Sequence, residues 1–505
     1  MKQFSTLKAP LTAAILLGAT PVFADVAPTD VWGDWKSQMA GFGYDITAKE
    51  TLSGPDLQVS ELQMRVEMPE EGGNVTVKMA GMTFHDNGDG TVAVQLPAIM
   101  PLDILVEAEG EDPVDIKVNY TTTGLSMIVS GTPDSMTYNY TAASMGMALA
   151  EIMAEGETVD LGEASITLNN VSGSASTSGS ALKNRKQDFR AEALFYNVEM
   201  ANPDNAEEQL KLTGQINDLS ARSTSAMPEN VDMENMAAAL KAGFAVDGNF
   251  EYAGGQSEFS FVGDGENVSG SSASESGSFA LSMNADQIAY SLGSSGTKLS
   301  LQSSDLPFPV ELALAETGFD IAIPVAKTED PQDFRFGLKL DGFTMSDMIW
   351  GMFDPAAQLP RDPATIAFNL TGKVKILADI FDPATMESLD DAAPGELHAL
   401  DINSLAVRAA GAELTGKGAF TFDNSDLQSF DGMPRPEGAL NLALTGGNAL
   451  LDTLVAMGFL PEDDANGARM MMGMFAVPGD GPDSLKSTIE VNDQGHLMAN
   501  GQRLK

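Results

Sequence analysis

Phe334-Arg335-Phe336-Gly337-Leu338-Lys339-Leu340 places an apolar side chain at every second position. Because successive side chains of a β-strand point to opposite faces, this stretch predicts a strand with one apolar and one polar face. The same alternation recurs along most of the chain. Further segments of this kind are residues 75–79, 92–96, 114–120, 125–129, 259–261, 281–283, 288–292, 310–314, 319–325, 366–370, 420–422, 440–444 and 489–491.

Short turns rich in Gly, Asn and Asp connect many of these segments, as at residues 86–90. Such turns are typical of hairpins, so neighbouring strands are expected to run antiparallel. The sequence therefore predicts a mainly β fold, with extended or sandwich-like antiparallel sheets and a few short amphipathic helices. Alternation alone leaves open whether the apolar faces close on one another or line an open groove.

A few segments show helical spacing of apolar residues instead. They are residues 31–42, 145–153, 233–240, 451–455 and 461–475. The last two predict a helix pair within residues 446–475. The second helix of that pair begins with three acidic residues, which suit the positive end of a helix dipole. Most of its apolar side chains are methionines.

Two Ser/Gly-rich patches, residues 170–176 and 267–274, resemble each other. Sequence of this kind is typical of linkers and exposed loops. The similarity indicates either two copies of one β module or a shared compositional bias. We therefore expect an antiparallel β region over residues 25–345, with two related modules as one alternative, and a C-terminal β region over residues 346–505.

The first 24 residues predict an export signal. Lys2 and Lys8 form a basic start, an apolar run follows at residues 9–19, and Val22-Phe23-Ala24 ends in a small residue. This order is typical of a secretory signal peptide cleaved after Ala24. No later stretch has the roughly 20 apolar residues of a membrane-spanning helix. We therefore expect a periplasmic protein with no membrane span after cleavage.

The charge balance restricts the partners. The chain has 505 residues, 28 Lys and Arg against 72 Asp and Glu, and a net charge of −44. Such a surface repels phosphate-rich partners, so a nucleic acid is not expected. The chain has no Cys, which excludes disulfides, thiolate metal sites and cysteine nucleophiles. Solubility explains the acidity most simply, and calcium binding or a cationic partner is the alternative.

Motifs that usually carry chemistry are incomplete here. Residues 411–417 match most of a phosphate-binding loop, but Gly418 replaces the hydroxyl residue and strand-like sequence follows. Residues 86–90 resemble part of a calcium loop, but strand-like sequence flanks them and Pro97 stands where a carboxylate would be needed, so a hairpin turn is the favoured interpretation. His85, His398 and His496 lie apart in the sequence, and Glu396, His398 and Asp401 alone make no complete metal site.

The motif Asp-Pro-Ala occurs at residues 354–356, 362–364 and 382–384. Asp before Pro is typical of a residue that starts a turn or a helix. We therefore predict no catalytic, cofactor-binding or metal-binding residue, no cofactor and no enzymatic activity.

Residues 350–355 (Trp-Gly-Met-Phe-Asp-Pro), 359–365 and 381–383 resemble an uncharacterised proteobacterial exported family, domain of unknown function 2125. Residues 124–131 and 305–309 are similar to it as well. The resemblance implies export but no activity, ligand or site residue. More weakly, strand 440–444, the helix pair and the final hairpin at 487–501 resemble the end of AsmA-like envelope proteins. That resemblance implies a long curved sheet with an apolar groove for lipids.

Two hypotheses for the function follow. The first is a non-enzymatic periplasmic protein that binds or shields a lipid or another apolar ligand, because many one-faced strands and 28 Met residues offer an adaptable apolar surface. The alternative is a periplasmic scaffold that binds another envelope protein, with no small ligand. A cleft with converging carboxylates would instead favour an enzyme.

Overall fold

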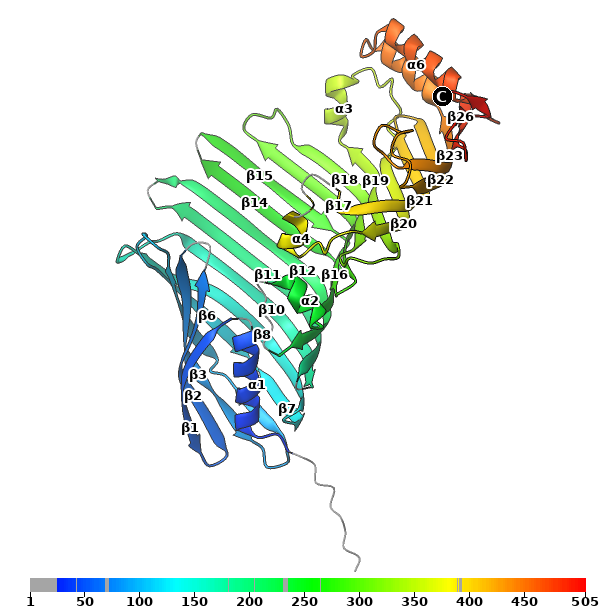
Figure 1. The fold of residues 1–505 in the computed structure, drawn as a ribbon. Helices are drawn as coiled ribbons and strands as arrows, with labels where there is room; N and C mark the ends of the chain where they lie inside the picture. The colour runs from blue at the N-terminus through cyan, green and yellow to red at the C-terminus, as the bar shows by residue number, and fades with distance from the viewer. Residues whose placement is uncertain are drawn as a thin grey trace, which may run out of the picture.

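The computed structural model describes residues 25–505 except 42, 69–71, 180, 204, 230–234, 264, 388 and 390–392. In the residues described, 27 strands form one sheet, and every strand pairing is antiparallel (Figure 1). The predicted mainly β fold is thus confirmed, in its extended rather than its sandwich form. The predicted signal peptide, residues 1–24, lies outside the described residues.

The strands follow the chain with few departures from sequence order. Their bounds are β1 Asp45–Ser53, β2 Asp56–Met68, β3 Gly73–Asp86, β4 Val92–Gln95, β5 Ile99–Glu107, β6 Val114–Thr123, β7 Ser126–Thr132, β8 Ser135–Ala154, β9 Glu157–Thr158, β10 Gly162–Ser178, β11 Leu182–Asn202, β12 Asn205–Pro228, β13 Ala245–Tyr252, β14 Gly255–Gly263, β15 Glu266–Ser274, β16 Ser276–Met283, β17 Gln287–Ser303, β18 Val310–Pro324, β19 Gln332–Met345, β20 Ala364–Ile376, β21 Gly395–Ala409, β22 Ala412–Asp423, β23 Arg435–Thr445, β24 Val477–Pro478, β25 Ser484–Val491, β26 Leu497–Ala499 and β27 Gln502–Arg503. The described helices are α1 Pro28–Gly41, α2 Met236–Lys241, α3 Asp347–Phe353, α4 Pro383–Glu387, α5 Gly447–Ala456 and α6 Glu462–Phe475.

Three residues in the left-handed region lie in a line across the long strands of this sheet, and we call this line the crease. Asn170 of β10 and Asp218 of β12 have φ values of 49°, in the left-handed region, and Gly254 separates β13 from β14 at φ 100°. A left-handed residue interrupts the two-residue alternation. As a result Leu168 and Val171, three residues apart, pack into one core cluster. The crease therefore keeps apolar side chains on one face although the sequence pattern changes phase.

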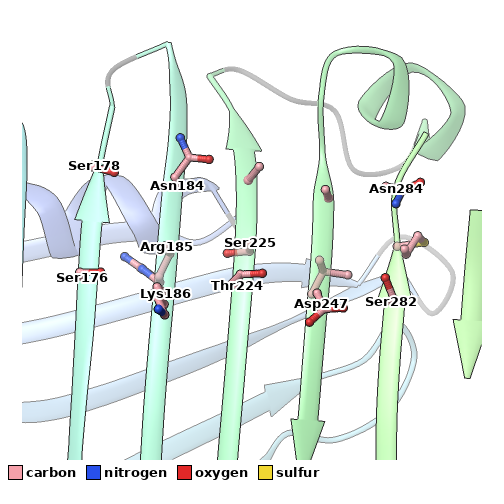
Figure 2. A pocket seen from close by; sticks show the side chains of 14 residues that line it. Ser176, Ser178, Asn184, Arg185, Lys186, Thr224, Ser225, Asp247, Ser282 and Asn284 are labelled. Carbon is pink, nitrogen blue, oxygen red and sulfur yellow. The ribbon is translucent and has the colours of Figure 1, made fainter. Parts of the chain in front are cut away.

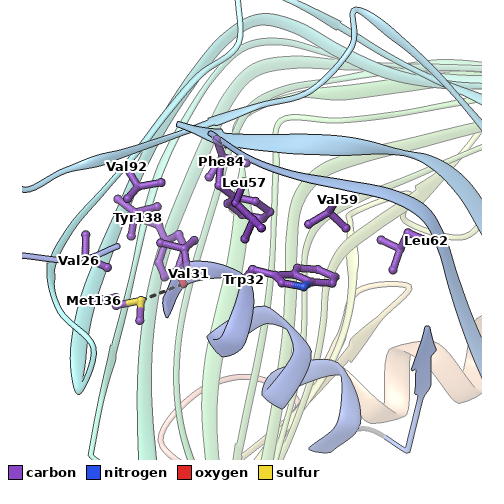
Figure 3. Packing of buried hydrophobic residues seen from close by; sticks show 12 residues of the cluster. Val26, Val31, Trp32, Leu57, Val59, Leu62, Phe84, Val92, Met136 and Tyr138 are labelled. Atoms are coloured by element: carbon purple, nitrogen blue, oxygen red, sulfur yellow. Dashed lines mark hydrogen bonds between the residues drawn. The ribbon is translucent and has the colours of Figure 1, made fainter. Parts of the chain in front are cut away.

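The largest core lies at the N-terminal end, where β1–β4, β7 and β8 surround α1 (Figure 3). Val31 and Trp32 of α1 are almost fully buried against Leu57 and Phe84 of the sheet. The predicted helical face of residues 31–42 is thus confirmed as far as Met39, while Phe42 lies outside the described residues. Burying these large side chains is the main source of stability at this end, at about 1.5–3 kcal/mol for each.

Two further helices pack on the same face of the sheet as α1. Leu240 of α2 and the nearby Phe244 form a small cluster with Met283 of β16 and with Phe381, which precedes α4. Lys241 of α2 donates a hydrogen bond of 2.6 Å to Asp379, which ties these segments together. Figure 1 shows α1, α2 and α4 on one side of the sheet, while α3 and α6 lie near its upper edge.

The helix predicted at residues 145–153 is wrong, because this segment lies in β8. β8 pairs with β6 and β10, and Met145 and Met147 alternate as in any strand. Between Leu149 and Glu151 the register with β6 shifts, so that Ala150 is an extra residue. The bulge puts Leu149 and Ile152, which are three residues apart in sequence, on the same face of the sheet. An apolar spacing of three residues is also typical of a helix.

The two Ser/Gly patches also differ from the prediction, since both lie in strands, β10 and β15, and are not linkers or loops. Aromatic rings explain their small residues. A Cβ at Gly173 would lie 2.3 Å from Oη of Tyr140, and one at Gly270 would lie 2.6 Å from the ring of Phe259. Glycine in a strand often marks such a close approach.

The helices and the final hairpin predicted near the C-terminus are present in the structure. Helix α5 and helix α6 form the predicted pair, and β25 and β26 form the final hairpin. β19 and β20, on either side of the expected division near residue 345, pair with each other. In the part of the chain that the structure describes, no helix has both the length and the apolarity needed to span a membrane.

Candidate functional site: the apolar face of the sheet

One face of the sheet carries continuous rows of apolar side chains. Residues paired across antiparallel strands lie on the same face, so the register defines each row. The first row runs from β13 to β23 and consists of Phe250, Phe279, Leu292, Phe319, Leu338, Phe368, Leu405, Gly416 and Leu442. At a strand spacing of about 4.8 Å this row extends for about 40 Å.

Two more rows flank the first on the same face. The second row contains Leu281, Tyr290, Ile321, Phe336, Leu370, Ile402, Gly418, Leu440 and Ile489. The third contains Leu340, Ile366, Val407, Leu414, Leu444 and Leu485. Phe336 lies 5.9 Å from Phe319 and 5.4 Å from Phe368 between ring centroids, which joins the first two rows. We call these three rows together the apolar face.

Much of the apolar face is uncovered. Leu292 is 52% exposed and Ile366 is 48% exposed, and Phe279, Tyr290 and Leu340 are each exposed by more than a third. The apolar face of a sheet is normally buried against a second layer of helices or strands. Among the described residues, the buried clusters that helices form on this face lie at the N-terminal end and beside α2.

The opposite face is charged. Cross-strand ion pairs on it include Arg222 with Asp188 at 3.2 Å and Lys211 with Glu199 at 3.3 Å. Asp188 alternates with Phe189, a residue packed against the buried cluster on the apolar side, so these ion pairs lie on the opposite side of the sheet. Exposed pairs of this kind contribute little stability, about 0–1 kcal/mol each. The two faces therefore differ in the chemistry of their exposed side chains, which are charged on one face and apolar on the other.

Two hollows of the structure lie on the charged face. One of about 470 Å³ is lined by Ser176, Lys186, Thr224, Asp247 and Ser282, which pair successively across five strands (Figure 2). A second, of about 530 Å³, lies over β15, β17, β18 and β19, and its lining mixes Ser and Thr with Leu299, Leu312 and Met345. The lining of neither hollow includes a histidine.

The candidate motifs of the sequence lie in turns and in pairs of surface residues. Residues 411–417 contain the turn between β21 and β22 and the start of β22. In the β3–β4 turn, Asp86 accepts a hydrogen bond from the Gly88 amide at 2.8 Å. The carboxylate of Asp89 accepts hydrogen bonds from Thr91, which lower its pKa. These carboxylates thus form the internal hydrogen bonds of a hairpin turn.

The remaining motifs also have local roles. Nδ1 of His85 lies 2.6 Å from Asp56 on the neighbouring strand. Buried Asp354 accepts hydrogen bonds from the amides of Gln358 and Leu359 just after α3, and Asp382 starts α4. Among the described residues, no group of three or more His, Asp or Glu side chains is placed to hold a metal ion.

Comparison with known proteins gives a family match. Residues 250–501 match the model of a family described as an uncharacterized protein conserved in bacteria (DUF2125). Neither a curated protein nor a solved structure matches the chain. The matched region begins in β13 and includes β14–β26, and therefore contains most of the apolar face.

Proposed function

The chain belongs to this uncharacterised bacterial family, and we propose that it is a non-enzymatic protein of the periplasm that binds the acyl chains of a lipid-like ligand on the apolar face. The observation that carries the proposal is the exposure of the three rows. Soluble proteins rarely expose apolar patches of more than a few hundred Å², and larger patches mark interaction sites. The role we infer is lipid handling in the bacterial envelope.

The dimensions of the apolar face suit hydrocarbon chains. Its rows run for about 40 Å, whereas one leaflet of a bilayer core is roughly 15 Å thick. Each methylene removed from water contributes about 0.8 kcal/mol, so even a chain half-covered by the sheet would bind favourably. The side chains of the rows are aliphatic or aromatic, which gives affinity for chains without selecting one particular length.

The rows provide a direct test. We expect lipid to be extracted from the purified protein and identified by mass spectrometry. Replacing Leu292 or Ile366 with Gln should weaken binding of a fluorescent fatty acid about fivefold, because each change removes roughly 1 kcal/mol of apolar contact. Phe195 is a matched control: it is 38% exposed but lies on the charged face, and Phe195→Gln should bind as wild type.

The proposal would be abandoned if the purified protein carried no lipid and bound no fatty acid. Equal weakening by Leu292→Gln and Phe195→Gln would also count against it, because the effect would then not depend on the face of the sheet. Thermal stabilisation by phospholipid or fatty acid, with none from polar metabolites, is the supporting result.

A scaffold that binds another envelope protein is the second candidate. The observation in its favour is the set of exposed methionines on α6, where Met470, Met471 and Met474 are each more than half exposed. Adaptable Met-rich surfaces suit protein partners. Capture of one defined periplasmic partner by cross-linking, lost when these three residues are replaced with Gln, together with no bound lipid, would favour the scaffold.

A further inference from the structure

Two cations interrupt the apolar side of the sheet at β11. Lys183 and Arg185 stand in the register of apolar-face residues, because Arg185 pairs with Thr177, the partner of the core residue Met136. In the described strands from β10 to β25, the other charged residues in such positions are Glu208 and Glu266, both at strand-end turns. A charge away from the turns on this side therefore needs an explanation.

One carboxylate accounts for only part of this charge. Asp34 of α1 lies 3.3 Å from Nζ of Lys183 and accepts a hydrogen bond of 2.9 Å from the hydroxyl of Tyr138. Arg185 lies farther away, with 4.0 Å between Nη2 and the carboxylate. Lys183 and Tyr138 thus satisfy Asp34, and the site keeps a net charge of +1.

Among the described residues, the guanidinium of Arg185 has no hydrogen-bond partner, and its nearest carboxylate is that of Asp34. Its side chain is only 19% exposed, and within the described structure it donates no hydrogen bond. Burial lowers the pKa of the Arg185 guanidinium, and the nearby Asp34 offsets this only in part. A guanidinium offers five N–H donors, and polar groups removed from water are nearly always hydrogen-bonded. The remaining exposure leaves it accessible to a ligand.

The neighbours of Arg185 make this part of the sheet polar. Thr177 and Ser225 are its cross-strand partners, and Gln187 pairs with Ser223 two positions away on the same face. We call these five residues the polar patch. Ser225 and Ser223 pair with residues of β13, and those residues pair in turn with Met283 and Leu281 of β16. Leu281 begins the second row of the apolar face. One face thus changes from polar to apolar along the sheet.

We propose that the polar patch binds the anionic head, a phosphate or carboxylate, of an amphiphile whose acyl chains lie on the apolar face. This rests on the proposed function and names the class of its ligand. Arginine suits both groups, since its fork of donors matches two oxygens. The overall charge of −44 repels anions at long range, but salt screens that field beyond about 8 Å, so contacts at the patch decide.

The test compares two ligands that differ only at the head. Lysophosphatidic acid and the monoacylglycerol with the same chain are titrated into the protein by calorimetry. We expect wild type to bind the anionic ligand at least about tenfold more tightly. Arg185→Gln should bring that ratio close to one, and Arg185→Lys, which keeps the charge, should retain most of it.

Lys186 supplies a matched control for the loss of one positive charge. It is the next residue of β11 but lies on the charged face, and Figure 2 shows its side chain leaving the strand in a different direction from Arg185. Lys186→Gln should keep the wild-type ratio. Inorganic phosphate alone should bind far more weakly than lysophosphatidic acid, because it lacks the chain.

Each outcome separates the two proposals. If neither amphiphile binds, the proposed function fails. If both bind with equal affinity to wild type, or if Arg185→Gln and Arg185→Lys both keep the preference, the acyl surface stands and the head site is wrong. If Lys186→Gln abolishes the preference as well, general charge explains it. Phosphate binding as tight as that of lysophosphatidic acid would overturn the assignment to an amphiphile.

Discussion

Single residues decide which face of the sheet each side chain joins. Asn170 and Asp218 adopt the left-handed conformation that Asn and Asp tolerate better than most residues. Each therefore shifts the phase of a strand without ending it. The sequence contains this signal as an Asn, Asp or Gly at the point where apolar residues are three apart. The alternation within each segment predicts the strands but not the crease, because the change of phase appears only when the two parts of a long strand are compared.

Asp218 tests the crease directly, because its side chain is exposed and a substitution acts mainly through the backbone. Asp218→Val should lower the free energy of unfolding by about 1–3 kcal/mol, since a β-branched residue is strained at φ 49°. Asp218→Gly removes the same carboxylate and relieves the strain, so we expect it to stay close to wild type. Urea unfolding followed by circular dichroism measures both. Equal losses would show that the carboxylate, not the backbone, matters.

The polar patch shows why the candidate site could be predicted only in part. Alternation predicted one apolar face, which is confirmed, but Lys183 and Arg185 were not recognised as belonging to it. The two-residue alternation of β11 is interrupted between Ala191 and Leu194, which lie on the same face although they are three residues apart. Alternation in the second half of β11 therefore assigns Lys183 and Arg185 to the wrong face. Contact with Asp34 of α1 connects residues about 150 positions apart, and no local pattern indicates it.

Among the elements, strands were predicted better than helices. Short turns fix antiparallel neighbours, so hairpins such as β21–β22 follow from local sequence. The error at β8 has a physical cause, because a bulge and a helix both place apolar residues three apart. The prediction of linkers or loops at the Ser/Gly patches is wrong because glycine also occurs in strands where a neighbouring aromatic ring leaves no room for a side chain, as at Gly173 and Gly270.

Helix α1 should detach from β1 more easily in acid. Glu50 of β1 accepts hydrogen bonds of 2.7 Å from Lys36 and from Nε1 of Trp32, and these lower the pKa of its carboxyl group. A lowered pKa means that the charged form favours the folded state. This stabilisation is complete above the ordinary value of 4.5 and is lost as pH falls through the lowered pKa of Glu50.

Glu50→Gln isolates this effect from the many other carboxylates. We expect wild type to melt at a higher temperature than Glu50→Gln at pH 7, and the difference to shrink as pH falls below 4.5. The magnitude should be modest because the Glu50 side chain is 40% exposed and solvent screens the pair. Trp32 fluorescence reports the docking of α1 in the same samples. A difference in melting temperature that grows toward acid would contradict the assignment.

At the scale of the whole molecule, the strands follow one another in a single layer, so each one packs mainly on the strands beside it. Apart from the N-terminal core, most strands contact only their two neighbours in the sheet, as repeats do in a solenoid. The larger buried clusters lie at the N-terminal end and at the crease of β8, β10, β11 and β12. In the part of the chain that the structure describes, most of the apolar face has no second layer, so the strands that carry it lack the packing that stabilises ordinary sheets.

Hydrogen exchange should therefore reveal a gradient of local stability. We expect amides of β2, β3 and β8, around α1, to exchange slowest, and those of β19–β22 to exchange faster, because local opening follows the amount of buried apolar contact. A bound acyl chain would act as the missing layer. A fatty acid at 100 times its dissociation constant stabilises the protein by about 2.7 kcal/mol, and this protection should concentrate in β16–β22. Uniform protection in the free protein would show that the strands of the apolar face are not the least stable part of the sheet. Ligand protection confined to the strands around α1 would show that the ligand does not cover the apolar face.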